Sequence, residues 1–474
     1  MLFPTIDFAI FFGVVFLGHW LLQPHRKLWK TFMVVASYVF YAWWDWHYIF
    51  LLGASTVFSQ VGAVAISRAK SERDRKRLLA ATLTAVLGLL FWFKYYGFFS
   101  LNLHNTLNVF GMRSSLPVLQ VALPVAISFF TFMAVSYVVD VYRKDLKPAG
   151  WLDYAAYLSF FPHLVAGPIV RGHELLPQIR RRRDPRRIDY SRAAYLIFGG
   201  LFKKVVISSF LAQGIVDPVF ASPGSHTSPE ILFAVYGYAV QIYADFSGYT
   251  DIAIGVALLM GIEFPQNFEA PYTARSLQDF WRRWHITLSR WLRDYVYIPL
   301  GGSRGTELQT VRNVLITMVL GGLWHGAGWT FVAWGLLHGV GLAVGLARRN
   351  RRAARGLPEL AEAPRAQLLQ RIATFHFVCL GWLFFRADSI GTALHMLGRL
   401  FTAFGSAPLV TPLVVLVVGL AIAIQYVPKD VPERVQDWFS GLRPVQQGAV
   451  LAGALFLITS LGPTGVAPFI YFRF

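Results

Sequence analysis

The chain has little charge and almost no cysteine for its length. Charged residues make up 15% and hydrophobic residues 55% of its 474 residues, whereas a soluble globular chain has about 25% charged and about 45–50% apolar residues. A soluble fold of this size would lack the charge that its surface needs, and intrinsic disorder, collagen and coiled coil are excluded as well. The single cysteine, Cys379, cannot form a disulfide within the chain and says nothing about the redox compartment.

Common signatures of soluble enzymes and of nucleic-acid binding are also missing. The sequence contains no phosphate-cradling glycine loop, zinc signature or nucleophile elbow. We therefore expect no metal site and no tightly bound cofactor. The net charge is +19, but no RNA- or DNA-reading motif accompanies it, so nucleic acid is not an expected partner. No signal peptide is evident, because the first apolar stretch lacks a basic segment before it.

Apolar stretches near the length that crosses a bilayer, about 20 residues, recur along the whole chain. Two of the loops between them, 100–117 and 214–230, contain a single lysine or arginine, Arg113. Basic residues cluster instead in the loops at residues 68–77, 171–192, 275–304 and 348–371. Because basic loops stay on the cytoplasmic side, the pattern predicts an all-α, polytopic membrane protein with the lipid bilayer as a partner.

Ten membrane-crossing helices, with both chain termini outside, satisfy this charge rule. We place them at residues 6–22, 29–43, 48–66, 78–99, 120–142, 192–213, 231–259, 372–385, 411–427 and 447–461. Two further apolar segments, 151–170 and 313–346, begin and end beside basic loops, so we expect both to be re-entrant. Each has Pro or Gly breakers at its middle, and non-helical backbone at membrane depth is tolerated where it is buried in protein or lines a wet cavity. These breaks therefore point toward a site.

The segment 280–295 has a different, amphipathic pattern. At about 100° per residue, its aromatic and leucine side chains share one face with His285. Its four arginines, Arg282, Arg283, Arg290 and Arg293, share another face. The pattern predicts an interfacial helix at the cytoplasmic boundary, with His285 on the buried side and the arginines toward phosphates.

Two histidines stand out by their context. His325 lies in a glycine-flanked break inside an apolar segment, where an ionisable side chain is costly and indicates a functional site. The alternative is a neutral histidine that is hydrogen-bonded between helices, and for His285 an ordinary interfacial histidine is the alternative. His338 follows His325 by thirteen residues, so in a continuous helix it would lie on the opposite face.

Two aspartates, Asp245 and Asp251, interrupt the apolar span 231–259. Carboxylates at membrane depth cost roughly 2.5–3.5 kcal/mol each and need partners. Residues six apart are not neighbours on a helix face, so an acid/base dyad is not expected. We expect Asp245, Ser247 and Asp251 to join helices to one another or to line the wall of a channel.

Five segments together resemble the membrane-bound O-acyltransferase family. They are 123–129 (LPVAISF), 159–171 (SFFPHLVAGPIVR), 243–255 (YADFSGYTDIAIG), 280–289 (FWRRWHITLS) and 322–326 (GLWHG). Within the family they are most similar to the bacterial alginate-type O-acetyltransferases, with the D-alanyl transfer protein of teichoic acid modification as a relative. The match spans about residues 1–385, and Met133 departs from it because relatives have glutamine there.

The resemblance implies helices arranged around a central tunnel in a bacterial inner membrane. It implies that an acyl donor, acetyl-CoA, enters from the cytoplasm and that the acyl group leaves outside toward an exported polysaccharide. His325 falls on the signature histidine of the family and His285 on its second active-site histidine. A histidine suits the base that activates a hydroxyl acceptor, so we expect His325 to be this base and His285 to polarise the thioester carbonyl. Trp324 would line the tunnel, and Arg282, Arg283, Arg290 and Arg293 would attract the phosphates of the donor.

The chain divides, on this reading, into an acyltransferase core at residues 1–385 and C-terminal membrane helices with an aromatic tail at 386–474. The tail resembles the C-terminal motif of a small companion protein of the D-alanylation system. Tyr471 has the one hydroxyl group among residues 468–474. We therefore expect Tyr471 to accept the acyl group from the donor and an extracytoplasmic acetyltransferase partner to unload it; the alternative is a membrane anchor.

Other functions remain open at this stage. Within enzymes, the alternatives are transfer of D-alanine and acylation of peptidoglycan or of a lipid. A transporter or polymer channel without chemistry is the alternative from another class, because broken helices are typical of transporters.

Overall fold

The computed structural model describes residues 1–112, 116–119, 122–358, 360, 363–428, 430–463, 465 and 469–470. The described residues form helices and connecting loops and include no β-strand, which confirms the all-α fold class. Two compact units are defined by their internal contacts. Unit 1 consists of Met1–Ala193 and Ala253–Pro265, and unit 2 consists of Ala194–Ile252 and Gln266–Phe474.

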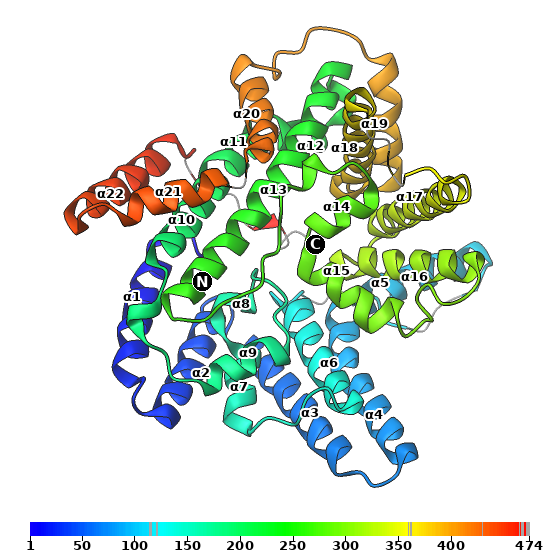
Figure 1. Ribbon diagram of the computed structural model, residues 1–474. Coiled ribbons are helices and arrows are strands. Elements are labelled where there is room, and N and C mark those ends of the chain that lie inside the picture. The colour runs from blue at the N-terminus through cyan, green and yellow to red at the C-terminus, as the bar shows by residue number, and fades with distance from the viewer. Residues whose placement is uncertain are drawn as a thin grey trace. The chain divides into compact units, whose positions relative to one another are not determined.

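Unit 1 is built on a group of packed helices in which α3, α4 and α6 contact one another, as do α7 and α9 (Figure 1). Helix α6 is buried along nearly its whole length, since its sequence is apolar on all sides, and it includes the buried Met133. The helices of unit 1 are α1 (Ile6–Leu22), α2 (Arg26–Ala42), α3 (Tyr48–Arg68), α4 (Glu72–Leu90), α5 (Tyr96–Val109), α6 (Ile127–Arg143), α7 (Trp151–Ser159), α8 (Phe161–Leu164) and α9 (Gly172–Arg180).

Unit 2 contains the helices that follow, of which α10 and α13 contribute residues to both units. They are α10 (Tyr190–Leu201), α11 (Ser209–Leu211), α12 (Asp217–Ala221), α13 (Ser228–Leu259), α14 (Leu277–Arg283), α15 (Ile286–Leu292), α16 (Glu307–His325), α17 (Trp329–Ala353), α18 (Pro364–Arg386), α19 (Ile390–Thr402), α20 (Pro412–Ala423), α21 (Asp430–Ser440) and α22 (Pro444–Leu461). Short π-helical segments adjoin some of them, including η3 (Phe202–Ser208) and η7 (Arg293–Tyr297).

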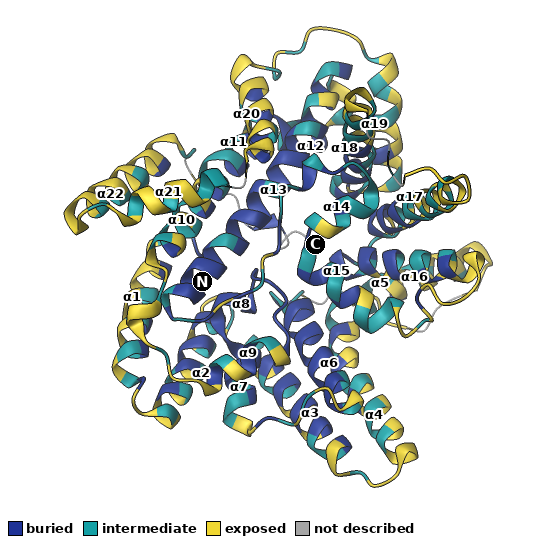
Figure 2. Ribbon diagram, viewed as in Figure 1, coloured by how far each residue is buried: buried dark blue, intermediate teal, exposed yellow. Residues whose placement is uncertain are grey.

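Burial differs sharply between the helices (Figure 2). In α13, 83% of the most apolar window is buried, against 6% in α22. Helix α13 therefore belongs to the core, whereas the apolar surface of α22 is left for lipid to cover.

The breaks expected in the two re-entrant segments are present. In the first segment, helix α7 ends at Ser159 and the short α8 begins at Phe161. In the second, α16 ends at His325 and α17 begins at Trp329, and the two helices pack side by side (Figure 1). Glycine permits this packing, because a Cβ atom on Gly322 would lie 2.2 Å from the Phe331 carbonyl oxygen.

The expected interfacial helix over residues 280–295 is not continuous, so that prediction was wrong in this respect. Helix α14 ends at Arg283, and His285 has φ +42°, in the left-handed region, before α15 starts at Ile286. Asn267 explains the break: its carbonyl oxygen accepts the Ile286 N–H and its side-chain oxygen accepts the Thr287 N–H, which satisfies the start of a new helix. His285 is nevertheless buried, as its position in the pattern predicted.

Seven helices among the described residues are long and apolar enough to cross a membrane, or eight if the bent pair Pro412–Tyr426 and Asp430–Ser440 forms one span. The seven are Tyr48–Arg68, Glu72–Val109, Tyr190–Ala221, Ser228–Leu259, Trp329–Ala353, Pro364–Arg386 and Pro444–Leu461. A polytopic membrane protein is thereby confirmed. The number of ten crossings, the central tunnel and the division at residue 385 stay predictions.

Candidate active site

His285 is buried in unit 2, and one of its two ring nitrogens is hydrogen-bonded. Its Nδ1 lies 3.2 Å from Oδ1 of Asn267. The same oxygen accepts the N–H and the hydroxyl of Thr287 at 3.1 and 2.9 Å, so it acts as an acceptor and the Nδ1 of His285 carries the proton. Burial lowers the pKa of His285 to about 3, which keeps the imidazole neutral. Nε2 therefore presents a lone pair, and it has no partner among the described residues.

His325 is the last residue of α16 and is surrounded by aromatic rings. Its ring centroid lies 5.1 Å from those of Trp334 and Phe385. Trp324 connects the two histidines, because its ring lies 5.7 Å from that of His285 and 5.0 Å from that of His325. The structure thus brings both sequence-predicted histidines and Trp324 into one cluster.

His338 does not lie on a face remote from His325, as a continuous helix would require. Because the chain turns back at Gly326–Gly328, Trp334 contacts both imidazoles, with ring centroids 5.1 Å from His325 and 4.9 Å from His338. His338 is fully buried and also packs on Trp281 at 5.4 Å.

A cavity of about 1190 Å³ opens beside this cluster within unit 2. Its wall includes Trp281, whose ring lies 5.6 Å from that of Trp334. Leucine, valine, methionine and phenylalanine side chains form much of the lining. The arginines that line it are Arg275, Arg282, Arg290, Arg293, Arg348, Arg349 and Arg352. A cavity with an apolar lining and many guanidinium groups suits an amphipathic anion.

Three of the four arginines assigned to donor binding from the sequence line this cavity. Arg283 does not line it; its Nε binds Asp279 at 2.7 Å, one helical turn away. Sequence reasoning missed Arg275, Arg348, Arg349 and Arg352 as cavity residues. The sequence held a signal for these residues. The basic loops 275–304 and 348–371 flank the expected re-entrant segment 313–346, and a segment that folds back brings its two ends together.

The two aspartates of α13 form ion pairs with two consecutive lysines of η3. Lys204 binds Asp245 and Lys203 binds Asp251, and Lys203 also donates to the Ser247 hydroxyl at 3.1 Å. The Asp245 pair is almost completely buried. The need for partners is confirmed, whereas the lysines themselves went unrecognised although they lie within an expected crossing. Because the aspartate oxygens are engaged by lysine, they stabilise the contact between η3 and α13.

The end of the described chain returns to the same pair. The Ile470 N–H donates to Oδ2 of Asp245 at 2.9 Å. Phe469 is fully buried, with its ring 4.5 Å from Tyr249 and 5.8 Å from Phe246. The ring of Phe246 in turn lies 4.6 Å from that of His285. Tyr471, the expected acyl acceptor, lies outside the described residues.

A histidine beside a helix break, a second buried histidine and an arginine-lined cavity thus lie together in unit 2. The family model for membrane-bound O-acyltransferases matches residues 74–381, and the chain belongs to this family. It is therefore an O-acyltransferase enzyme, and a channel without chemistry is set aside.

Similar proteins have names that specify particular acyl-transfer reactions. A probable alginate O-acetylase AlgI of Azotobacter vinelandii is 39% identical over 410 residues, which cover 85% of this chain and 78% of the relative. A peptidoglycan O-acetyltransferase of Helicobacter pylori is 39% identical over 425 residues, covering 83% and 78%. A teichoic acid D-alanyltransferase of Streptococcus thermophilus is 31% identical over 280 residues, covering 55% and 67%.

Proposed function

We propose that the protein transfers an acetyl group from cytoplasmic acetyl-CoA, across the bacterial inner membrane, toward an exported cell-surface polysaccharide of the alginate type. The arginine-lined cavity is the observation that carries this proposal. At about 1190 Å³ it exceeds the roughly 300–1,000 Å³ of an ordinary ligand pocket, which suits a nucleotide with a long pantetheine arm. The phosphates would bind the arginines, and the thioester would approach the cluster of Trp334 and His325.

The acyl acceptor in this proposal is the hydroxyl of Tyr471. Two observations support it: Phe469 and Ile470, which precede it, are buried in unit 2, and Phe469 is separated from His285 by the single ring of Phe246. A tethered hydroxyl has a high effective concentration at the active site. It also links a donor on one side of the membrane with a polymer on the other.

The chemistry is a transesterification in two stages. His325 takes the proton of the Tyr471 hydroxyl, the oxygen attacks the thioester carbonyl carbon, and the carbon–sulfur bond breaks. The thiolate then receives the proton from the imidazolium, which leaves free coenzyme A and an acetyl-tyrosine ester. An extracytoplasmic acetyltransferase partner unloads this ester onto a polymer hydroxyl and regenerates Tyr471.

For His285 we propose hydrogen-bond acceptance in place of the carbonyl polarisation suggested by the sequence. A neutral imidazole that donates from Nδ1 to Asn267 has no proton on Nε2 and cannot donate to a carbonyl oxygen. Its lone pair can accept a hydrogen bond, from the Tyr471 hydroxyl before His325 takes its proton or from the thiol after His325 returns it.

A second candidate acceptor is peptidoglycan, and the similarity to the Helicobacter pylori peptidoglycan O-acetyltransferase favours it. Both acceptors present sugar hydroxyls, so the donor half of the reaction is shared. Glycan analysis of the cell envelope from a deletion strain separates them, because acetyl groups disappear from one polymer and persist on the other.

The donor is tested with purified protein and two thioesters, acetyl-CoA and acetyl-pantetheine, which lacks the nucleotide phosphates. Arg282→Gln should raise KM for acetyl-CoA about tenfold or more, since a charge-assisted hydrogen bond contributes about 1.5–3 kcal/mol, and leave acetyl-pantetheine unaffected. Arg304→Gln is the control, because Arg304 does not line the cavity. Equal KM values for both thioesters in the wild-type enzyme would contradict the assignment of the cavity.

A further inference from the structure

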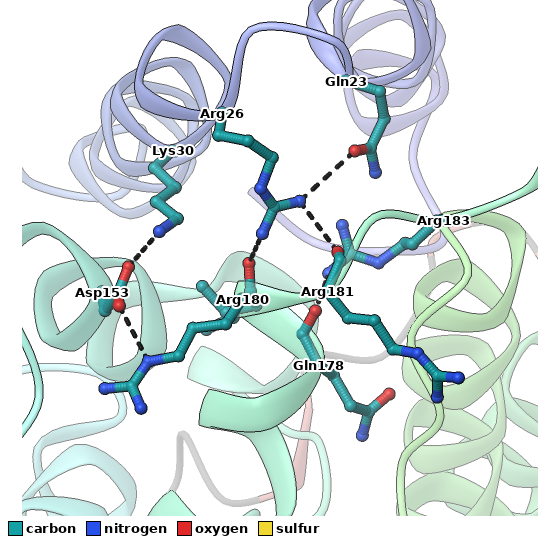
Figure 3. Close-up of polar contacts among 9 residues, drawn as sticks. Gln23, Arg26, Lys30, Asp153, Gln178, Arg180, Arg181 and Arg183 are labelled. Carbon is teal, nitrogen blue, oxygen red and sulfur yellow. Dashed lines mark hydrogen bonds and ion pairs between the residues drawn. The ribbon is translucent and has the colours of Figure 1, made fainter.

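A group of hydrogen-bond donors, only some of which have an acceptor among the described residues, lies in unit 1 where α1 is followed by α2 (Figure 3). Arg26 donates through Nη1 to the Arg181 carbonyl oxygen at 2.8 Å and through Nη2 to the Ile179 carbonyl oxygen. Arg183 donates through Nη2 to the Gln178 carbonyl oxygen at 2.9 Å. Both guanidinium groups thus reach carbonyls at the C-terminal end of α9, which carry partial negative charge.

These carbonyls satisfy only part of the donors. Nε and Nη1 of Arg183 are buried and have no partner among the described residues. Gln23 is 7% exposed, and its Oε1 accepts from Nη1 of Arg26 at 3.5 Å; its buried amide nitrogen Nε2 has no partner in the part of the chain that the structure describes. Every unsatisfied group here is a donor, so the missing partner is an acceptor.

The charge of the same region is also unbalanced. The negative charge of Asp153 acts on Arg26, but this carboxylate is engaged by Lys30 and by Arg180 at 2.9 Å. Burial, with a smaller contribution from Arg26, lowers the pKa of Arg183 to about 9. The guanidinium carbons of Arg26 and Arg183 lie 5.3 and 4.6 Å from the centre of the Trp29 ring. The indole therefore packs against both guanidinium groups, but it has no negative charge that could balance theirs. A bound anion would supply both the acceptor and the negative charge.

An exposed apolar stripe adjoins these donors. Along α1, five large aliphatic side chains spaced four, four, three and four residues apart are 63–79% exposed: Ile6, Ile10, Val14, Leu17 and Leu21. Leu28, Val35 and Val39 continue the exposed apolar surface on α2. The stripe ends two residues before Gln23. In a bilayer such a surface is covered by acyl chains, and a head group would then lie at the level of the donors.

We propose that Gln23, Arg26 and Arg183 bind the phosphate of an anionic phospholipid whose acyl chains lie along the exposed faces of α1 and α2. The phosphate oxygens accept hydrogen bonds from Nε and Nη1 of Arg183 and from Nε2 of Gln23. The exposed Arg181 and Arg182 add positive potential around the head group. This site belongs to unit 1 and is independent of the acetyl-transfer chemistry.

Binding is measured on the purified full-length protein by native mass spectrometry and by thermal unfolding, in micelles that contain phosphatidylglycerol or phosphatidylcholine. Phosphatidylglycerol should bind more tightly and raise the unfolding temperature. Arg183→Gln should weaken phosphatidylglycerol binding about fivefold, because each basic residue near an anionic membrane surface contributes about 1 kcal/mol. Gln23→Met removes the amide donor without changing charge and should weaken binding in the same direction.

Arg187→Gln is the matched control, because the side chain of Arg187 is 85% exposed and lies in the same basic segment. An equal loss of phosphatidylglycerol binding in Arg187→Gln would show that general surface charge explains the effect, and it would overturn the proposed site. Inorganic phosphate that stabilises the protein as strongly as phosphatidylglycerol would overturn the lipid assignment. If Arg183→Gln does not fold, Arg183→Lys keeps the charge and removes the Nε and Nη1 donors; unchanged lipid binding in that variant would contradict the proposal.

Discussion

Asn267 holds the imidazole of His285 through a 3.2 Å hydrogen bond to Nδ1 and thereby assigns the lone pair to Nε2. The same amide starts α15 by accepting the Thr287 N–H, so one side chain sets both the helix break and the protonation of the histidine. This relationship leads to the first prediction.

Asn267→Asp should move the acid side of the pH–rate profile to higher pH. Burial lowers the pKa of His285 to about 3, so the imidazole is neutral at every pH above that value. A carboxylate at hydrogen-bond distance favours the imidazolium and raises this pKa by about 1–3 units. The neutral, active form is then lost at a higher pH as the pH falls. The profile of acetyl transfer measures the shift, and an unchanged acid side would exclude the neutral His285 as a required hydrogen-bond acceptor.

His325→Ala should lower acetyl transfer by about 10²–10⁴, the usual contribution of a general base, with normal amounts of protein in the membrane. His395→Ala is the control, since His395 is exposed on α19. Incorporation of labelled acetate into extracellular polymer gives the rate. Wild-type incorporation in His325→Ala would place the base elsewhere.

Tyr471→Phe should stop polymer acetylation while leaving acetyl-CoA binding intact, because the substitution keeps the ring and removes the hydroxyl nucleophile. Labelled acetyl-CoA should also yield an acetylated C-terminal peptide in the wild type and none in the variant, as seen by mass spectrometry. Full polymer acetylation in Tyr471→Phe would leave the tail as a membrane anchor and require direct transfer to the polymer.

Ile470→Pro should impair transfer by about tenfold or more, because proline removes the N–H that Asp245 accepts and leaves a buried carboxylate oxygen short of a donor. Ile470→Val keeps that N–H and serves as the control. Polymer acetylation and hydrolysis of acetyl-CoA are measured together. Loss of the first with retention of the second would show that the tail, not the donor site, is affected, whereas equal acetylation in the two variants would exclude the Asp245 contact as a requirement.

The sidedness of the membrane predicts labelling of introduced cysteines. A cysteine at Ser222 should react from outside with an impermeant thiol reagent, and one at Lys70 should react only after the membrane is opened. Lys70 is preferable to Ser71, whose hydroxyl caps α4. The native Cys379 is buried and gives little background. The reverse pattern would invert the topology and the side from which the donor enters.

The helical, membrane-embedded class of this protein follows from the sequence alone, because the bilayer imposes length and composition on each span. The glycine-flanked break at His325 was visible for the same reason: helix breakers and an ionisable side chain are rare at membrane depth. His285 was placed on the buried side by periodicity, although the pattern could not show that Asn267, eighteen residues earlier, accepts the first N–H groups of α15.

Contacts between residues far apart in the chain were decided only by the tertiary structure. Lys203 and Lys204 pair with Asp251 and Asp245 through the packing of η3 on α13, and no spacing in the sequence records which lysine meets which aspartate. His338 shares Trp334 with His325 because the chain reverses at Gly326–Gly328, whereas a one-dimensional periodicity assumes that a helix continues. Ile470 reaches Asp245 across 225 residues of sequence. Local patterns determine which segments form helices and which face is apolar; burial and hydrogen bonding between distant segments determine the partners.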